Sequence, residues 1–142
     1  MKTARRHSRE IALQALYAWQ LGGGDPLDEL RSLDEEGHAD RELAEALVRG
    51  VIERAGELQA LIAPCLDRDF ARLSPVERAI LYIGAHELSA HPETPFKVVI
   101  NEAIELGKSF GGTGGHKFVN GVLEKLALTL RPDEAARGKQ PA

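Results

Sequence analysis

Apolar residues recur at three- and four-residue steps through most of the chain, and glycine or proline separates the segments that carry this pattern. Such a repeat places apolar side chains on one face of an α-helix, whereas a half-buried strand would alternate with a period of two. The pattern predicts helices over residues 8–21, 26–33, 40–63, 74–91, 94–110 and 116–131, and a short helical turn within 66–72. The sequence therefore predicts an all-α fold of about seven helices.

Helix-start signals support these boundaries. Asp25-Pro26 and Thr94-Pro95 each combine a capping residue with a proline at the first helical position. Ser74-Pro75-Val76-Glu77 adds a glutamate that can reach back to the amide of its own cap, which is the pattern of a capping box. We therefore expect well-defined helix starts at these three places.

Length and composition are those of one globular domain. The 142 residues are 43% hydrophobic and 28% charged, enough for one core and too few for two. We expect a helical domain over residues 1–131 and a flexible tail over 132–142, where apolar periodicity is absent. No apolar run approaches the ~20 residues of a membrane span, and no signal-peptide pattern is present. With a single cysteine, Cys65, the chain is expected to be cytoplasmic.

Positive charge is concentrated at the N-terminus of an otherwise acidic chain. The net charge is −4, but residues 1–9 contain four bases and no acid, whereas residues 25–57 contain eleven acids and four bases. The four bases, spaced as a helical stripe, are Lys2, Arg5, Arg6 and Arg9. Because this stripe runs onto the apolar face of the first helix, we expect the arm either to overhang the body or to stay disordered until a ligand neutralises it. Arginine-rich segments that order on binding commonly hold RNA.

The stretch GGTGGHK at 111–117 resembles a phosphate-binding loop only superficially. His116 stands where the phosphate loop requires its second glycine, and Phe118 stands where it requires serine or threonine. The segment also follows a helix rather than a strand. We expect it to end one helix, begin the next and leave Lys117 and backbone amides open to an anion.

Catalytic and metal-binding patterns are weak. His86 and His91 are five residues apart, which points them in different directions on a helix, so a shared metal ion is not expected. No nucleophile or acid–base pattern stands out. We therefore expect neither enzymatic activity nor a cofactor.

Three blocks of the sequence resemble the NusB family of bacterial transcription factors. They are RRHSREIALQALYAWQL at 5–21, PFKVVINEAIELGKSF at 95–110 and HKFVNGVLEKL at 116–126. The resemblance continues in order and at matching spacing as far as Arg131. It implies a NusB-like helical bundle without catalytic activity. NusB proteins bind boxA RNA together with NusE, a small-subunit ribosomal protein, and the pair nucleates an antitermination complex on RNA polymerase, notably at ribosomal RNA operons.

The resemblance also suggests residue roles. The expected RNA-binding residues are the basic arm, one aromatic residue of the first helix and the start of the last block, namely Lys2, Arg5, Arg6, Arg9, Tyr17, His116, Lys117 and Phe118. Glu77 matches the region that docks NusE, and the periodicity adds Leu81 and Tyr82 as exposed apolar neighbours.

The chain departs from the family pattern in two places. The loop GGTGG replaces acidic or polar residues, and His7 and Ser8 interrupt the arm, so RNA affinity or selectivity is expected to differ. A second hypothesis is a helical protein–protein interaction module, or a homodimer, in which RNA contact is secondary.

Overall fold

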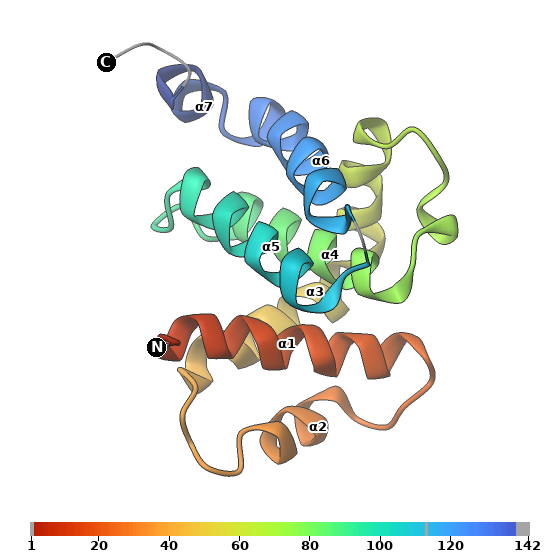
Figure 1. Ribbon diagram of the computed structural model, residues 1–142, viewed down its shortest axis with the longest axis vertical. Helices are drawn as coiled ribbons and strands as arrows, with labels where there is room; N and C mark the ends of the chain where they lie inside the picture. The colour runs from red at the N-terminus through yellow and green to blue at the C-terminus, as the bar shows by residue number, and fades with distance from the viewer. Residues whose placement is uncertain (1, 113, 139–142) are drawn as a thin grey trace.

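A computed structural model describes residues 2–112 and 114–138, and these form seven α-helices and two short 3-10 turns (Figure 1). The elements in chain order are α1 (Ala4–Gln20), α2 (Pro26–Leu33), α3 (Arg41–Ile62), η1 (Ala63–Cys65), η2 (Phe70–Arg72), α4 (Pro75–Ala90), α5 (Phe96–Phe110), α6 (Gly115–Leu130) and α7 (Pro132–Gly138). The all-α prediction is confirmed. Among the described helices, none combines the length and the hydropathy needed to cross a membrane.

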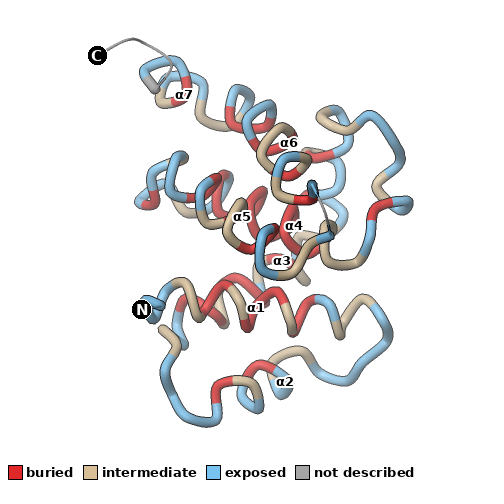
Figure 2. The backbone as a smooth tube through the Cα atoms, viewed as in Figure 1, coloured by how far each residue is buried: buried red, intermediate tan, exposed pale blue. Residues whose placement is uncertain are grey.

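The helices form two groups that share one core. Helices α1, α2 and α3 pack against one another, as do α4, α5 and α6, and α4 also contacts α1 and α3 (Figures 1 and 2). Every residue of α4 from Ala79 to Leu88 is buried. A helix that is buried on all sides lies at the centre of a fold, so α4 is the axis that joins the two groups.

Helix α1 begins four residues earlier than the apolar pattern indicates. Thr3 caps it, because its Oγ1 accepts a hydrogen bond from the amide of Arg6 at 3.0 Å. Ser8 is buried and donates to the carbonyl of Asp40 at 2.7 Å, which ties this first turn to the start of α3. The expectation of an overhanging or disordered arm is wrong for the described residues, because from Ala4 onward the arm is part of a packed helix.

Two of the three predicted caps form. Asp25 accepts from the amide of Leu27 at 2.9 Å, and Ser74 and Glu77 make the reciprocal bonds of a capping box at 3.1 and 3.2 Å. The third start differs, because Thr94 makes no capping bond and Pro95 occupies the N-cap position of α5.

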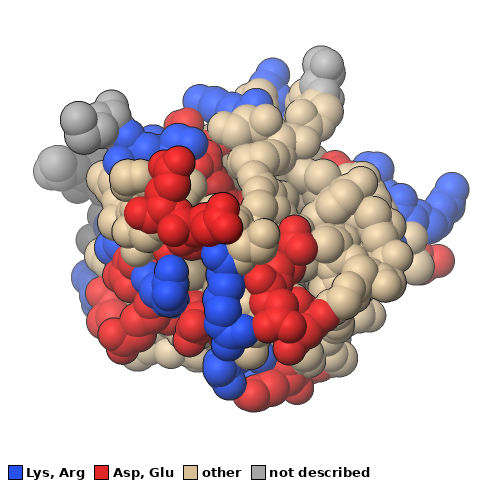
Figure 3. Space-filling view, turned by 90° about the horizontal axis from the view of Figure 1, so that it is seen from below, with Lys and Arg blue, Asp and Glu red and all other residues tan. Residues whose placement is uncertain are grey.

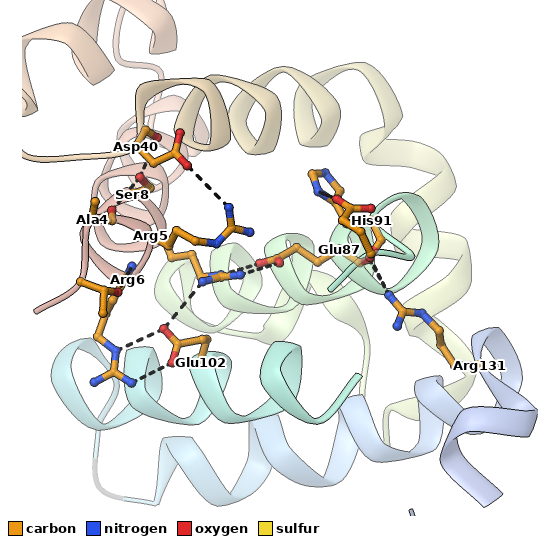
Figure 4. Close-up of polar contacts among 12 residues, drawn as sticks. Ala4, Arg5, Arg6, Ser8, Asp40, Glu87, His91, Glu102 and Arg131 are labelled. Carbon is orange, nitrogen blue, oxygen red and sulfur yellow. Dashed lines mark hydrogen bonds and ion pairs between the residues drawn. The ribbon is translucent and has the colours of Figure 1, made fainter. Parts of the chain in front are cut away.

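Helix α7 replaces most of the expected flexible tail. Residues 132–138 are helical, and residues 139–142 lie outside the described part of the chain. Glu134 accepts a hydrogen bond from the amide of Phe96 at 2.7 Å, so α7 supplies the cap that Thr94 does not. The neighbouring Arg131 donates to carbonyls at the end of α4, including those of Leu88 (2.9 Å) and His91 (2.9 Å) (Figure 4). Contacts between distant segments therefore hold residues that show no apolar periodicity of their own.

Candidate nucleic-acid interface

The cations of the arm point to different helices and do not form one stripe. Arg5 is exposed and lies 3.5 Å from Asp40, the cap of α3. Arg6 points to α5, where its Nε and Nη2 donate to the carboxylate of Glu102 at 3.2 and 2.8 Å (Figure 4). The hydrogen bond and charge of Glu102 raise the pKa of Arg6. Each of these guanidinium groups therefore already has a carboxylate partner.

Arg9 belongs to the core. It is only 3% exposed, and its Nε and Nη2 donate to the carboxylate of Glu87 at 2.8 and 2.9 Å. Glu87 is 1% exposed and lies on the central helix α4. Burial lowers the pKa of Arg9, but the hydrogen bonds and charge of Glu87, together with the charge of Glu102 at 3.7 Å, raise it more, so the guanidinium stays charged. The expectation that Arg9 presents its charge to RNA is wrong, because the side chain is sequestered in a buried ion pair.

A cavity of about 270 Å³ separates the start of α1 from the C-terminal half of α5. Its charged lining consists of three cations and three carboxylates, namely Lys2, Arg6, Arg9, Glu10, Glu102 and Glu105. Lys2 is bound to Glu10 at 2.7 Å. The molecular face that carries α1 and α2 shows the same mixture, with basic and acidic side chains interleaved over it (Figure 3). The arm is thus much less electropositive than its sequence indicates.

The second predicted group lies at the start of α6. Gly114 takes a left-handed conformation, φ 81°, which a residue with a side chain rarely adopts, and it occupies the N-cap position. Lys117 is exposed, whereas His116 and Phe118 are half-buried. The amides of Lys117 and Phe118 donate to the carbonyl of Gly114 at 3.1 and 3.3 Å. The expectation that this turn leaves its amides open is therefore wrong for these two residues, and Lys117 offers its charge through the side chain alone.

Helix α5 connects the two groups. Arg6 binds it at Glu102, and His116 packs on it at Gly107, where an added Cβ would lie 2.8 Å from the Cα of His116. These two positions of α5 are about 7.5 Å apart along its axis and about 140° apart around it, so α5 contacts α1 and α6 with different sides. Tyr17 is 40% exposed and lies close to three helical turns after Arg6, so both side chains leave α1 on the same side. We take as the candidate interface the face that runs from the Arg6–Tyr17 side of α1 to the first turn of α6, and we assign to it the predicted RNA-binding residues other than Arg5 and Arg9.

One residue of this face was missed by the sequence analysis. Arg68, in the segment between η1 and η2, places its guanidinium carbon over the ring of Phe118 at 5.1 Å from the ring centre. Asp67 accepts hydrogen bonds from its Nε and Nη2 at 2.8 and 3.4 Å. Nothing in the sequence distinguishes Arg68 from other loop arginines, because the partner ring lies fifty residues further along the chain.

The candidate partner residues divide into one at the surface and two in the core. Glu77 is half-buried at the start of α4, where it closes the capping box. Leu81 is fully buried and Tyr82 is 4% exposed, so the expectation that they form an exposed apolar patch is wrong. Tyr82 packs its ring on Phe70, with ring centres 5.1 Å apart. The expectation from periodicity took one face of this helix to be exposed to solvent, whereas α4 is buried on every side from Ala79 to Leu88.

Comparison with known proteins identifies the fold family. A family model described as the NusB family matches residues 6–128, most of the chain. The chain belongs to the NusB family. This confirms the resemblance that the three sequence blocks indicated and assigns the chain to the NusB transcription antitermination factors.

Individual relatives agree with this assignment. The transcription antitermination protein NusB of Paraburkholderia phytofirmans is 51% identical over 143 aligned residues, which cover 99% of both chains. The structure of NusB from T. maritima matches with a TM-score of 0.84 at 32% identity, covering 96% of this chain and 99% of that one. A crystal structure of antitermination factors NusB and NusE in complex with dsRNA matches with a TM-score of 0.79 at 28% identity, covering 91% and 99% of the two chains.

Two features of this NusB-family chain lie away from the candidate interface. The rings of His86 and His91 are 5.2 Å apart despite their five-residue spacing, because His91 leaves the helix as the C-cap of α4. Within residues 2–112 and 114–138, no three His, Cys, Asp or Glu side chains gather as metal ligands do. A separate cavity of about 540 Å³ lies between α5, α6 and α7, where Val98, Ile104 and Ala135 are among its lining residues.

Proposed function

We propose that this chain is a non-catalytic RNA-binding factor that binds boxA single-stranded RNA together with NusE and assembles an antitermination complex on RNA polymerase, notably at ribosomal RNA operons. The observation that carries the proposal is the first turn of α6, where the exposed Lys117 stands beside the half-buried ring of Phe118. A cation beside a partly exposed aromatic ring suits a flexible strand, because the cation attracts phosphates while aromatic groups stack on unpaired bases. Action beside RNA polymerase is consistent with a cytoplasmic location.

The residues of the face contribute unequally. Lys117 offers an exposed charge to a phosphate, and Tyr17 offers an exposed ring for stacking. The half-buried ring of Phe118 lies beside them and is partly covered by Arg68. Arg6 and Lys2 are bound to Glu102 and Glu10, and the negative charge of these carboxylates offsets part of their attraction for phosphates. Arg5 is exposed but lies beside Asp40, outside the candidate interface, so it attracts RNA only through its charge. His116 is half-buried against α5, within reach of the same strand.

The start of α4 is proposed to dock NusE. Glu77 is accessible there, and its carboxylate is held by the backbone amide of Ser74 at 3.2 Å. A fixed carboxylate suits recognition of a basic side chain on the partner, because little side-chain freedom is lost on binding. The related complex of NusB, NusE and dsRNA supports the choice of partner.

A fluorescence anisotropy titration tests the proposed function. Labelled boxA-like and scrambled single strands are titrated with the chain, with and without NusE, at several salt concentrations. We expect boxA-like RNA to bind more tightly than the scrambled strand, and NusE to strengthen that preference. Lys117→Ala is expected to weaken binding and to reduce the slope of log K against log salt by about 0.7, the value for one phosphate contact on a single strand. Equal affinity for both strands under all conditions would refute the proposal.

One observation favours the second candidate, a module that acts mainly through protein contacts. The cavity between α5, α6 and α7 has a largely apolar lining, and Val98 and Leu128 are 43% and 45% exposed. Sedimentation of the chain alone distinguishes the two functions. A stable homodimer that Val98→Asp disrupts, together with weak RNA binding, would favour the second candidate.

A further inference from the structure

Phe118 is covered by a cation from a different part of the chain. Its ring packs against the core, and the guanidinium carbon of Arg68 lies over it at 5.1 Å from the ring centre. Phe118 lies on α6, whereas Arg68 belongs to the segment between η1 and η2. The ring that the proposed function offers to a base is therefore already paired with a planar cation.

The position of Arg68 is defined, yet the side chain is accessible. Asp67 accepts from its Nε and Nη2, and within the described residues its Nη1 makes no hydrogen bond. The Arg68 side chain remains 49% exposed. An exposed cation–π contact and an exposed ion pair contribute little to stability, so the fold alone does not require this arrangement.

Arg68 contacts one of the two surfaces that the proposed function uses, and the charge of the other acts on it. Its contact with Phe118 joins it to the first turn of α6. The hydrogen bond and charge of Asp67 raise the pKa of Arg68, and the charge of Glu77 adds a smaller effect in the same direction. Glu77 lies in the first turn of the helix proposed to dock NusE, and a strand lying across Phe118 would meet Arg68.

We propose that Arg68 is an RNA-binding residue of this face, whose guanidinium lies over Phe118 and provides the surface on which an unpaired base stacks. This inference rests on the proposed function and adds a residue to it. An arginine plane stacks on bases much as an aromatic ring does, and its free Nη1 can bind the adjacent phosphate. Asp67 holds the guanidinium in place before RNA arrives, which reduces the entropy lost on binding.

Three substitutions test the role of Arg68. Arg68→Ala removes both stacking and charge, and Arg68→Lys keeps the charge but removes the planar group. Arg72→Ala is the matched control, because Arg72 is an exposed arginine of the neighbouring turn η2. Each variant, checked for folding by circular dichroism, is titrated with boxA-like RNA that carries 2-aminopurine at one position at a time, since the fluorescence of this base falls when it stacks.

We expect Arg68→Ala to weaken binding about tenfold and to reduce the salt slope by about 0.7. Arg68→Lys is expected to keep the slope but lose the fluorescence quenching at one base, and Arg72→Ala to change affinity less than about threefold with quenching intact. Equal or tighter RNA binding by Arg68→Ala, with unchanged quenching, would overturn the role of Arg68. Failure of the unsubstituted chain to prefer boxA-like RNA would instead refute the proposed function itself.

Discussion

At the scale of single residues, Arg9 and Glu87 form a buried ion pair that joins α1 to α4. Their side chains are 4% and 1% exposed, so water does not stabilise either charge and each charge is stabilised mainly by the other. Removing one partner of such a pair leaves an uncompensated charge in the core, whereas removing both does not. The pair therefore makes α1 dependent on the correct placement of α4.

This dependence gives the first prediction. Arg9→Ala is expected to lower the free energy of unfolding by about 3–5 kcal/mol, because it leaves Glu87 charged and unpaired. Urea denaturation measures the change. Arg5→Ala, which removes an exposed arginine from the same turn, is the control and is expected to cost less than about 0.5 kcal/mol. The double substitution Arg9→Met with Glu87→Met is expected to recover most of the loss, and additive losses would contradict a coupled pair.

His86 is a second buried polar residue with consequences for stability. It is 6% exposed, its ring fills the space above Gly50, and its Nδ1 lies 3.0 Å from Nη1 of Arg54. Burial, the neighbouring His91 and Arg54 lower the pKa of His86 from 6.5 to about 4. The folded state therefore favours neutral His86, and the unfolded state binds a proton first as the pH falls.

The second prediction is a loss of stability in weak acid. The contribution of His86 is fully present above pH 6.5 and is lost as the pH falls from 6.5 toward 4, by about 3 kcal/mol in total. Urea denaturation at a series of pH values measures this slope. His86→Gln is expected to flatten it, whereas His38→Gln, at an exposed histidine, should leave it unchanged. Identical slopes for the His86 variant and the parent would show that His86 does not carry the effect.

The sequence alone could not predict which single residues of the candidate site are buried. Arg9 and Leu81 look like surface residues in a helical repeat, and only partners from other helices show that they are buried. Lys117 was predicted correctly to be exposed, because its position beside glycines at a helix start is a local feature. Arg68 was not predicted as a site residue, because only its contact with the distant Phe118 ring distinguishes it from other loop arginines.

At the scale of elements, α7 and α5 stabilise each other through a capping bond. Glu134 accepts from the amide of Phe96, and this bond and the cation Arg131 lower the pKa of Glu134 despite the opposing effect of burial. The amides of the first turn of a helix need such partners, and Pro95 at the N-cap has no side-chain acceptor. An acidic residue near the N-terminus of α5 also interacts favourably with the helix dipole.

The third prediction concerns this cap. Glu134→Ala is expected to lower the free energy of unfolding by about 1 kcal/mol, which is typical for the loss of an N-terminal cap. Asp133→Ala removes a neighbouring exposed carboxylate that makes no hydrogen bond with the described residues, and it serves as the control. Thermal denaturation of both variants measures the difference. Equal effects of the two substitutions would mean that the bond to Phe96 contributes nothing.

Local signals predicted elements well, and distant contacts explain the failures. The capping box at Ser74 formed as predicted, because both of its bonds lie within four residues. Helix α7 was not predicted, because Ala135 is the only buried apolar residue among those of α7 whose burial is described. Its capping bond is to α5, and the preceding Arg131 is bound to α4. The start of α1 was placed too late for a similar reason, since residues 4–7 have no large apolar side chain and are held by the Thr3 cap and by the bond of Arg6 to α5.

At the scale of the whole molecule, the fold turns an apparently basic arm into a nearly neutral surface. Lys2 and Arg6 are bound to carboxylates of α1 and α5, and Arg9 is buried. Arg68, at the other end of the candidate interface, is partly exposed but also ion-paired. Lys117 beside it is exposed and makes no ion pair with the described residues. RNA affinity is therefore expected to come from stacking and a few phosphate contacts rather than from a long cationic stripe.

Chemical-shift mapping on the isotopically labelled protein tests most directly where RNA binds. On titration with boxA-like RNA, we expect the amide signals of Arg68, Lys117 and Phe118 to move most, followed by those around Tyr17, with smaller changes for a scrambled strand. Signals around the separate cavity, including Val98 and Ala135, should stay in place. Shifts centred on that cavity, with the first turn of α6 unchanged, would contradict the proposed RNA-binding face.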